Sequence, residues 1–384
     1  MKAKSQTALG KKAFVISTKN VELSLTETGG HMAPVTFCKD TKKPIQPYYI
    51  SPWQEEGITA GLPVLEPLRG DFFCMPFGAD NDYKKEKHTV HGEVSSKLWK
   101  MNSSEEKDGV VSLSLSMKTK KRPGTAVKNI QLVEGQNVVY VQHVLGGYSG
   151  KMCLGHHATL AVPEKEGAMR VSSSPFAFGR VGDRPALATA ENEYYSLKAG
   201  AEFKKLDKVP TIWKDEPWTD LTRFPMREGF VDIAAIYKKA GPKPAWMAAA
   251  VPSEGYLWFS LKDPEILPQT VVWISNKGRH GAPWNGRNQC LGLEDTCAYS
   301  ADGLKNSAKK NPVSEKGFKT VLTLNPKKPL TVNYIEGVVQ IPKTFDRVAK
   351  VQFEKTGLRF ISDSGKEVTA PVVWDFIKTG TISL

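Results

Sequence analysis

The sequence predicts an all-β protein, a large antiparallel β-sandwich of two packed sheets. Three observations lead to this fold class. Apolar and polar residues alternate with a period of two, most clearly in residues 110–116, and strands with one buried face show that period. The 25 Pro and 32 Gly residues supply frequent turns. Long helical patterns are scarce, and residues 230–239 fit either a short helix or a strand.

Further strand candidates follow in chain order, beside turns. Residues 134–136 predict the turn of one hairpin, and residues 325–329 the turn of another. Apolar segments near the C-terminus predict a small meander. The strand candidates around these turns and in the meander are residues 21–25, 32–37, 137–145, 319–324, 330–334, 351–353, 358–361 and 372–374.

We expect one large domain with an addition at each end. Residues 1–12 are polar and contain lysines, which predicts an N-terminal tail. Residues 13–342 form the predicted sandwich, because all-β folds often run past about 200 residues as one domain. Residues 343–384 hold the meander and form a predicted C-terminal β extension packed on the sandwich.

The composition narrows the class of protein. The 384 residues are 40% hydrophobic and 24% charged, which is typical of a globular domain. The net charge of +13 comes from 53 Lys and Arg against 40 Asp and Glu, and it permits an anionic partner. No basic helix, zinc-finger spacing or RNA-binding aromatic motif accompanies this charge, so we expect no nucleic-acid partner. The five cysteines form no CxxC pair, and no regular ligand spacing predicts a metal site.

The location of the protein is predicted from the segments that the sequence lacks. No apolar run reaches the roughly 18 residues that span a bilayer, so we expect no membrane partner. The first twelve residues contain no apolar segment of the kind found in signal peptides. We therefore expect a cytoplasmic protein. A periplasmic or secreted protein whose signal peptide has been removed would show the same N-terminus.

The segment that ends at Glu294 carries the strongest functional signal. An apolar strand candidate precedes Arg279, Trp284 and Arg287, and Glu294 follows them. Aromatic rings suit the apolar face of a sugar, forked arginine donors suit hydroxyl groups, and a carboxylate can transfer a proton. An ion pair between Glu294 and one of these arginines explains the same segment equally well.

Polar residues in three upstream clusters are further candidates. Arg69 precedes a glycine and an apolar run, which suggests a guanidinium at a strand edge; a structural ion pair is the alternative. His91 also precedes a glycine, and imidazole can donate or accept a proton near neutral pH. His156 and His157 are adjacent in an apolar strand. Alternation sends them to opposite faces, so at most one of them faces a given site.

In this order, the clusters resemble the galactose mutarotase-like (aldose 1-epimerase) superfamily, most closely its hexose-6-phosphate epimerase-like branch. The resemblance covers roughly residues 13–340 as separate motifs. At Ser95 the chain departs from the branch, which has an arginine there that helps to hold phosphate. The matching motifs are Gly29-Gly30, Arg69-Gly70, Pro76-Phe77-Gly78, His91-Gly92, Trp99, His157, Asp232 to Tyr237, and Trp273 with Asn276 and Leu293-Glu294.

The resemblance implies a supersandwich fold and the interconversion of α and β anomers of a hexose or modified hexose. It implies that Glu294 removes the proton of the C1 hydroxyl and that His157 protonates the ring oxygen, from opposite sides of the anomeric carbon. His157 matches by its spacing to Leu160 and Pro163. Because no redox change occurs, no cofactor is needed.

The same resemblance and the residues beside the catalytic pair predict how the sugar is bound. Arg69 and His91 would hold hydroxyl groups or polarise the ring oxygen, and Asp232 would bind another hydroxyl. Trp284 would stack on the sugar's apolar face; a core tryptophan at the edge of the site is the alternative. The net charge, with Arg279 and Arg287, leaves an anionic sugar open.

Two other functions fit the same residues. One is a non-catalytic carbohydrate-binding protein of this fold, because a fold does not fix a function. The other is a polysaccharide lyase or hydrolase. Hydrolysis needs two carboxylates at a defined separation, and the adjacent pair Glu294 and Asp295 would point to opposite faces of a strand.

Overall fold

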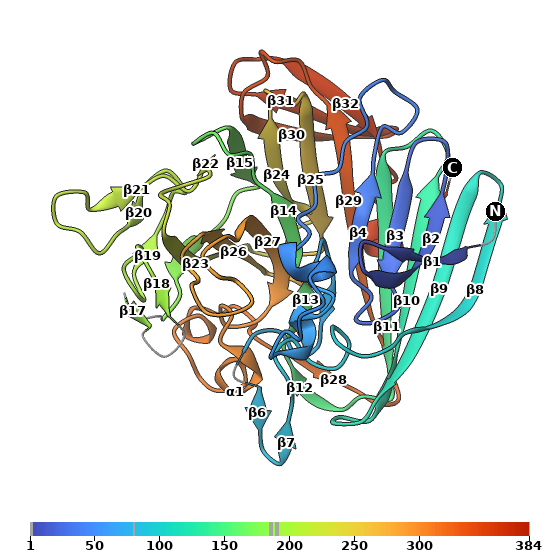
Figure 1. The fold of residues 1–384 in the computed structure, drawn as a ribbon, viewed down its shortest axis with the longest axis horizontal. Helices are drawn as coiled ribbons and strands as arrows, with labels where there is room; N and C mark the ends of the chain where they lie inside the picture. The colour runs from blue at the N-terminus through green and yellow to red at the C-terminus, as the bar shows by residue number, and fades with distance from the viewer. Residues whose placement is uncertain (1–2, 80, 184–186, 189–191, 384) are drawn as a thin grey trace.

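The computed structural model describes residues 3–79, 81–183, 187–188 and 192–383. These residues form two large antiparallel sheets that pack together, which confirms the predicted all-β sandwich (Figure 1). The nine-stranded sheet has the order β22 (Arg223–Phe224), β15 (Met169–Ser173), β24 (Ala245–Val251), β25 (Tyr256–Lys262), β29 (Leu330–Gln340), β11 (Val138–Gly146), β10 (Gly124–Val133), β9 (Val110–Thr119), β8 (Lys100–Lys107). The eight-stranded sheet has the order β19 (Glu202–Phe203), β16 (Phe178–Val181), β23 (Phe230–Tyr237), β26 (Gln269–Asn276), β27 (Gln289–Cys297), β13 (Leu154–His156), β5 (Phe73–Cys74), with β14 (Ala158–Ala161) also paired to β27.

Smaller elements surround the two sheets. A four-stranded sheet near the N-terminus contains β1 (Lys4–Ala8), β2 (Lys11–Ser17), β3 (Glu22–Thr26) and β4 (Met32–Thr36), and it lies in front of β9–β11 in Figure 1. A three-stranded sheet near the C-terminus contains β30 (Val348–Glu354), β31 (Gly357–Ser362) and β32 (Glu367–Pro371). The remaining paired strands are β6 (Asp82–Tyr83), β7 (Glu86–Lys87), β12 (Gly150–Met152), β28 (Leu322–Leu324), β17 (Leu187–Ala188), β18 (Glu193–Tyr194), β20 (Val209–Pro210) and β21 (Trp218–Thr219). The short helices are η1 (Pro52–Glu55), η2 (Pro63–Leu65), α1 (Gly303–Ser307), η3 (Ser314–Lys316) and α2 (Phe376–Thr379).

The centre of the eight-stranded sheet is buried on both faces. Every residue of β26 is buried, as is every residue of β27 except the first. One face of β27 meets the nine-stranded sheet, where Asp295 lies 2.5 Å from Lys262 and accepts hydrogen bonds from Ser260 and Tyr334. Since alternate residues of a strand point to opposite faces, Glu294 lies on the other face.

Residues near the C-terminus cover part of the outer face of the nine-stranded sheet. Strands β30–β32 and helix α2 pack on it through a second hydrophobic core. In this core the rings of Phe259 and Phe360 lie 5.1 Å apart. Both faces of β24 and β25 are therefore buried, which explains the unbroken apolar run of β24.

The N-terminus differs from the predicted tail over residues 1–12. The structure places Lys4–Ala8 in β1 and pairs this strand with β2. The side chains of β1 are polar because most of them are exposed, so their composition is typical of a tail although the backbone is in a sheet.

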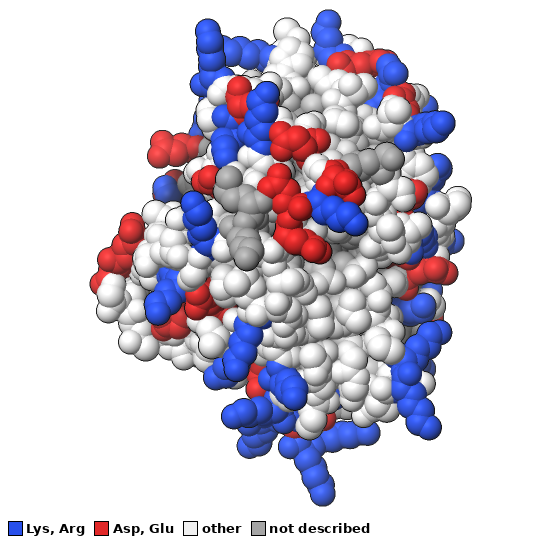
Figure 2. Space-filling view, turned by 90° about the vertical axis from the view of Figure 1, so that its right-hand side faces the viewer, with Lys and Arg blue, Asp and Glu red and all other residues white. Residues whose placement is uncertain are grey.

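The surface in Figure 2 carries Lys and Arg side chains around its edges with Asp and Glu side chains among them. The excess of positive charge is therefore not gathered into one basic patch on this face. Among the described residues, no helix is both long and apolar enough to cross a membrane.

Candidate active site

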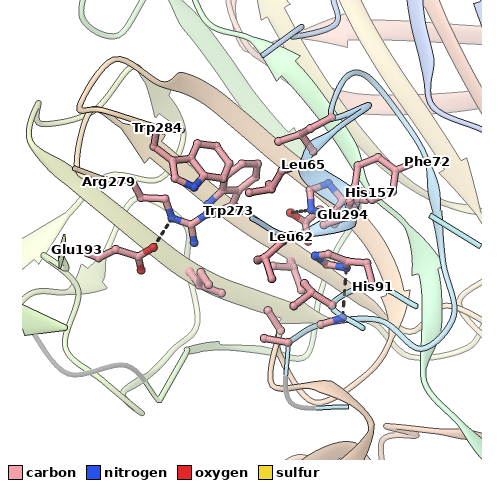
Figure 3. Close-up of a pocket in the computed structure, with 18 of the residues that line it drawn as sticks. Leu62, Leu65, Phe72, His91, His157, Glu193, Trp273, Arg279, Trp284 and Glu294 are labelled. Carbon is pink, nitrogen blue, oxygen red and sulfur yellow. Dashed lines mark hydrogen bonds and ion pairs between the residues drawn. The ribbon is translucent and has the colours of Figure 1, made fainter. Parts of the chain in front are cut away.

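A cavity of about 310 Å³ lies on the face of the eight-stranded sheet that carries Glu294 (Figure 3). Its size is in the range that proteins use to bind small molecules. Strands β23, β26 and β27 contribute Ile233, Val271, Trp273 and Glu294. Loops, helix η2 and strand β18 supply the other walls. The residues of these walls that matter most below are Leu62, Leu65, Phe72, His91, His157, Glu193, Tyr195, Arg279 and Trp284.

Strand pairing places His157 beside Glu294. Strand β27 pairs with β13 on one side of His157 and with β14 on the other, so the histidine falls at the break between these strands. His157 Nε2 lies 3.2 Å from Glu294 Oε1. Gly292 makes room for this carboxylate, because a Cβ at Gly292 would lie 2.5 Å from Glu294 Oε1.

Burial sets the protonation of this pair. Glu294 is 2% exposed and His157 is 5% exposed. Burial raises the pKa of Glu294 well above its ordinary value, against the opposing charge of Arg279. Burial, helped by His91, lowers the pKa of His157 well below its ordinary value. Both shifts favour a carboxylic acid beside a neutral imidazole over a charged pair, a state in which the two side chains share one transferable proton.

His91 is placed to donate a hydrogen bond into the cavity. The backbone N–H of Gly78 donates to His91 Nδ1 at 3.3 Å, which assigns the ring proton to Nε2. Burial lowers the pKa of His91 to about 3, and the charge of Arg279 contributes, so the ring stays neutral. The ring centroids of His91 and His157 are 4.9 Å apart. A neutral N–H donor thus stands next to the acid–base pair.

Arg279 and Glu193 form the wall farther from this pair (Figure 3). Arg279 Nε lies 2.5 Å from Glu193 Oε1, and the backbones of the two residues form an isolated β-bridge. The guanidinium carbon lies 5.5 Å from the ring of Trp273 and 4.8 Å from that of Trp284. Tyr195 donates its hydroxyl proton to the second oxygen of Glu193. These contacts fix the guanidinium in one place.

The structure brings together five of the predicted site residues. Glu294, His157, His91, Arg279 and Trp284 all line the cavity. Their convergence is the geometric condition that the proposed acid–base chemistry requires.

Arg69 does not line the cavity, in contrast to the expectation that it would bind substrate. Its side chain is fully buried and donates hydrogen bonds to the carbonyl oxygens of Ala8 and Leu9 at 2.9 and 2.8 Å. It also donates to Gln54 Oε1 at 2.6 Å. Arg69 therefore joins helix η1 to the β1–β2 turn, and its two terminal nitrogens, Nη1 and Nη2, are used in structure.

Asp232 and Arg287 also lie outside the cavity. Ile233 faces the cavity, so alternation turns Asp232 away, and its carboxylate accepts hydrogen bonds from Ser196 and from the N–H of Leu197. Arg287 forms a two-pronged ion pair with Glu56, with contacts of 2.5 and 2.7 Å. Neither side chain therefore lies where the sequence led us to expect it, because these carboxylate and guanidinium groups have protein partners outside the cavity.

His156 faces the interior between the two large sheets. Its Nδ1 lies 2.8 Å from Asp71 Oδ2, and its ring stacks on Tyr334 with centroids 4.0 Å apart. Between the two adjacent histidines, it is His157 that reaches the cavity.

Sequence reasoning missed Glu193, Tyr195 and Phe72. In the sequence Glu193 lies close to other polar residues, Glu191 and Asn192, where an acidic side chain is expected to be solvated. Phe72 stacks on His157 with ring centroids 4.4 Å apart, but in the sequence it is one apolar residue in an apolar run. We find no local pattern that would have identified Glu193.

No family model and no curated protein matches this sequence. Solved structures match its fold. A galactose mutarotase-like protein from Clostridium acetobutylicum aligns with a TM-score of 0.61 and 12% identity, over 88% of this chain and 98% of that one. A protein from Klebsiella pneumoniae, provisionally named an aldose 1-epimerase, aligns with a TM-score of 0.60 and 15% identity, over 88% and 83%. A protein from Escherichia coli K12 with the same provisional name gives 0.56 and 11%, over 86% and 99%. The chain therefore has the galactose mutarotase-like fold.

Proposed function

We propose that this protein is an aldose 1-epimerase that interconverts the α and β anomers of a hexose or modified hexose. The observation that carries the proposal is the buried pair of Glu294 and His157, 3.2 Å apart in a sugar-sized cavity beside the N–H donor of His91. The galactose mutarotase-like fold supports it. Fold alone would not, because one fold serves many functions.

The reaction needs one proton to leave the C1 hydroxyl and one to reach the ring oxygen. The C1–O5 bond then breaks, the aldehyde turns about the C1–C2 bond, and the ring closes on the other face. The hydroxyl oxygen and the ring oxygen are both bonded to C1. An acid and a base that are adjacent to each other can therefore transfer protons to and from both oxygens. The pair thus acts from one wall of the cavity, whereas the sequence-based mechanism placed it on opposite sides of the anomeric carbon.

The single proton of the pair lets either residue begin the cycle. With the proton on His157, Glu294 accepts the C1 hydroxyl proton and His157 donates to the ring oxygen. After ring opening the proton lies on Glu294, which is the state that burial favours in the free protein. Ring closure reverses the transfer, so no net proton is gained or lost. General acid–base catalysis of this kind contributes roughly 10²–10⁴-fold to a rate.

Exchange spectroscopy on the anomeric protons of glucose and galactose tests this proposal. The wild-type protein should accelerate exchange between anomers, and His157→Gln should lose most of that acceleration while still binding the sugar in calorimetry. Glu216→Gln, which alters a surface ion pair with Arg227, is the control and should behave as wild type. Sugar binding without any acceleration by the wild-type protein would instead identify a non-catalytic carbohydrate-binding protein.

A further inference from the structure

We propose that the cavity takes an uncharged sugar with fewer hydroxyl groups than a hexose, namely a deoxy sugar. Glu193 excludes anionic sugars by neutralising Arg279. The turnover assay for this inference rests on the proposed function. The structural argument uses only the residues that line the cavity.

The first observation concerns charge. Among the described residues that line the cavity, Arg279 is the single Lys or Arg. Its partner Glu193 lies 2.5 Å away, and the two side chains are 20% and 12% exposed. A phosphate or carboxylate on the sugar would meet both members of this pair at once. The attraction to the guanidinium would therefore be offset by repulsion from the carboxylate.

The other basic groups that could have held an anion are turned away. Arg69 is bonded to backbone oxygens and Gln54, and Arg287 is paired with Glu56. Although the protein's net charge is +13, the described residues that line the cavity include no Lys or Arg without an acidic partner.

The second observation concerns hydrogen bonding. Three leucines, three valines and one isoleucine line the cavity, and their side chains have no hydrogen-bonding atoms. Leu62 and Leu65 lie between the Glu294–His157 pair and the Arg279–Glu193 pair in Figure 3. A hydroxyl group placed against this aliphatic wall would lose its water partners without replacement. A hydrogen atom or methyl group at that position of the sugar would pack favourably.

A matched panel of sugars measures both preferences. The panel contains a hexose, its 2-deoxy and 6-deoxy forms, its 6-phosphate and its uronic acid, in the gluco and galacto series. We expect at least one deoxy sugar to exceed its parent hexose in kcat/KM by roughly tenfold to a hundredfold, the effect of one unpaired buried hydroxyl. The 6-phosphate and the uronic acid should fall below the parent.

Glu193→Gln isolates the contribution of charge. The amide oxygen of glutamine can still accept the hydrogen bond from Tyr195, while the charge that neutralises Arg279 is lost. The variant should raise the ratio of 6-phosphate to parent hexose in kcat/KM by about tenfold. Glu216→Gln, which breaks a surface Arg–Glu pair outside the cavity, should leave that ratio unchanged.

Each sugar is also titrated by calorimetry, so binding is measured even without turnover. The inference is overturned if a charged sugar binds or reacts best, if the parent hexoses equal both deoxy forms, or if Glu193→Gln leaves the 6-phosphate ratio unchanged. If the sugars bind in the expected order but no anomer exchange is accelerated, the proposed epimerase activity is refuted and the inference is supported. If exchange is accelerated but the sugars bind in the opposite order, the inference is refuted and the epimerase activity is supported.

Discussion

Glu294→Gln should change activity and stability in opposite directions. The substitution keeps the shape of the side chain and removes its ability to exchange a proton. Because the pair then lacks one of its two proton carriers, we expect kcat to fall by roughly 10²–10⁴-fold. The KM should change little, since the amide can still occupy the space beside His157.

The effect on stability follows from the raised pKa of the buried carboxyl group. In the folded protein burial raises the pKa of Glu294 above its ordinary value of 4.5, so the folded state holds this proton more tightly than the unfolded state. This contribution to stability is complete below the unfolded pKa and is lost as the pH rises through the folded pKa. Each unit of the pKa difference corresponds to about 1.4 kcal/mol. The stability of the Gln variant has no such pH dependence. The variant should therefore be more stable than the wild type at pH values above the folded pKa of Glu294, and equally stable at pH values below the unfolded pKa.

Urea denaturation of both proteins at about pH 4 and about pH 8 measures this difference, with the slopes compared to check two-state behaviour. Anomer exchange measured over the same range should give the wild type a bell-shaped profile, because catalysis requires exactly one proton on the pair. Glu228→Gln, at an exposed ion pair with Lys277, serves as control. The reasoning fails if Glu294→Gln is the less stable protein at the higher pH, or if it keeps more than about a tenth of the wild-type kcat.

Three further substitutions test the placement of other residues. Lys262→Met should lower the free energy of unfolding in urea by about 3–5 kcal/mol, because Asp295 is left buried without its cation; adding Asp295→Leu should restore much of the loss, and no recovery would contradict this account. His91→Phe should raise KM by roughly threefold to tenfold through the loss of one hydrogen bond, with folding retained by circular dichroism; an unchanged KM would remove His91 from the substrate contacts. Arg69→Met should cost about 1–3 kcal/mol of stability by leaving backbone oxygens unpaired, and should leave KM unchanged; a large rise in KM would return Arg69 to the site.

Part of the site could be predicted because it depends on the period of a strand. Alternation requires Glu294 and Asp295 to face opposite ways, and the same holds for His156 and His157. The all-β class followed from the same period. The position of His91 before a glycine also proved informative, since its backbone has a φ of 58° and the turn aims the imidazole at the cavity.

The remainder depended on contacts between distant parts of the chain. The sequence suggested that Arg69 binds substrate. In the folded chain, backbone oxygens about 60 positions earlier accept hydrogen bonds from its guanidinium. Asp232 looked like a hydroxyl ligand until a loop covered its face of the strand. Glu193 entered the cavity because its backbone bridges to Arg279, some 86 positions later.

The sequence by itself determined the fold class and the opposite orientation of neighbouring strand residues such as Glu294 and Asp295, because both follow from the period of a strand. Glu294 and His157 were singled out by the resemblance of short motifs. Tertiary structure alone decided which of the polar side chains still have free hydrogen-bonding atoms facing a cavity. The physical reason is that a buried polar group takes whichever partner the folded chain brings nearest. An arginine therefore becomes part of the framework or part of the site according to residues far away in the sequence.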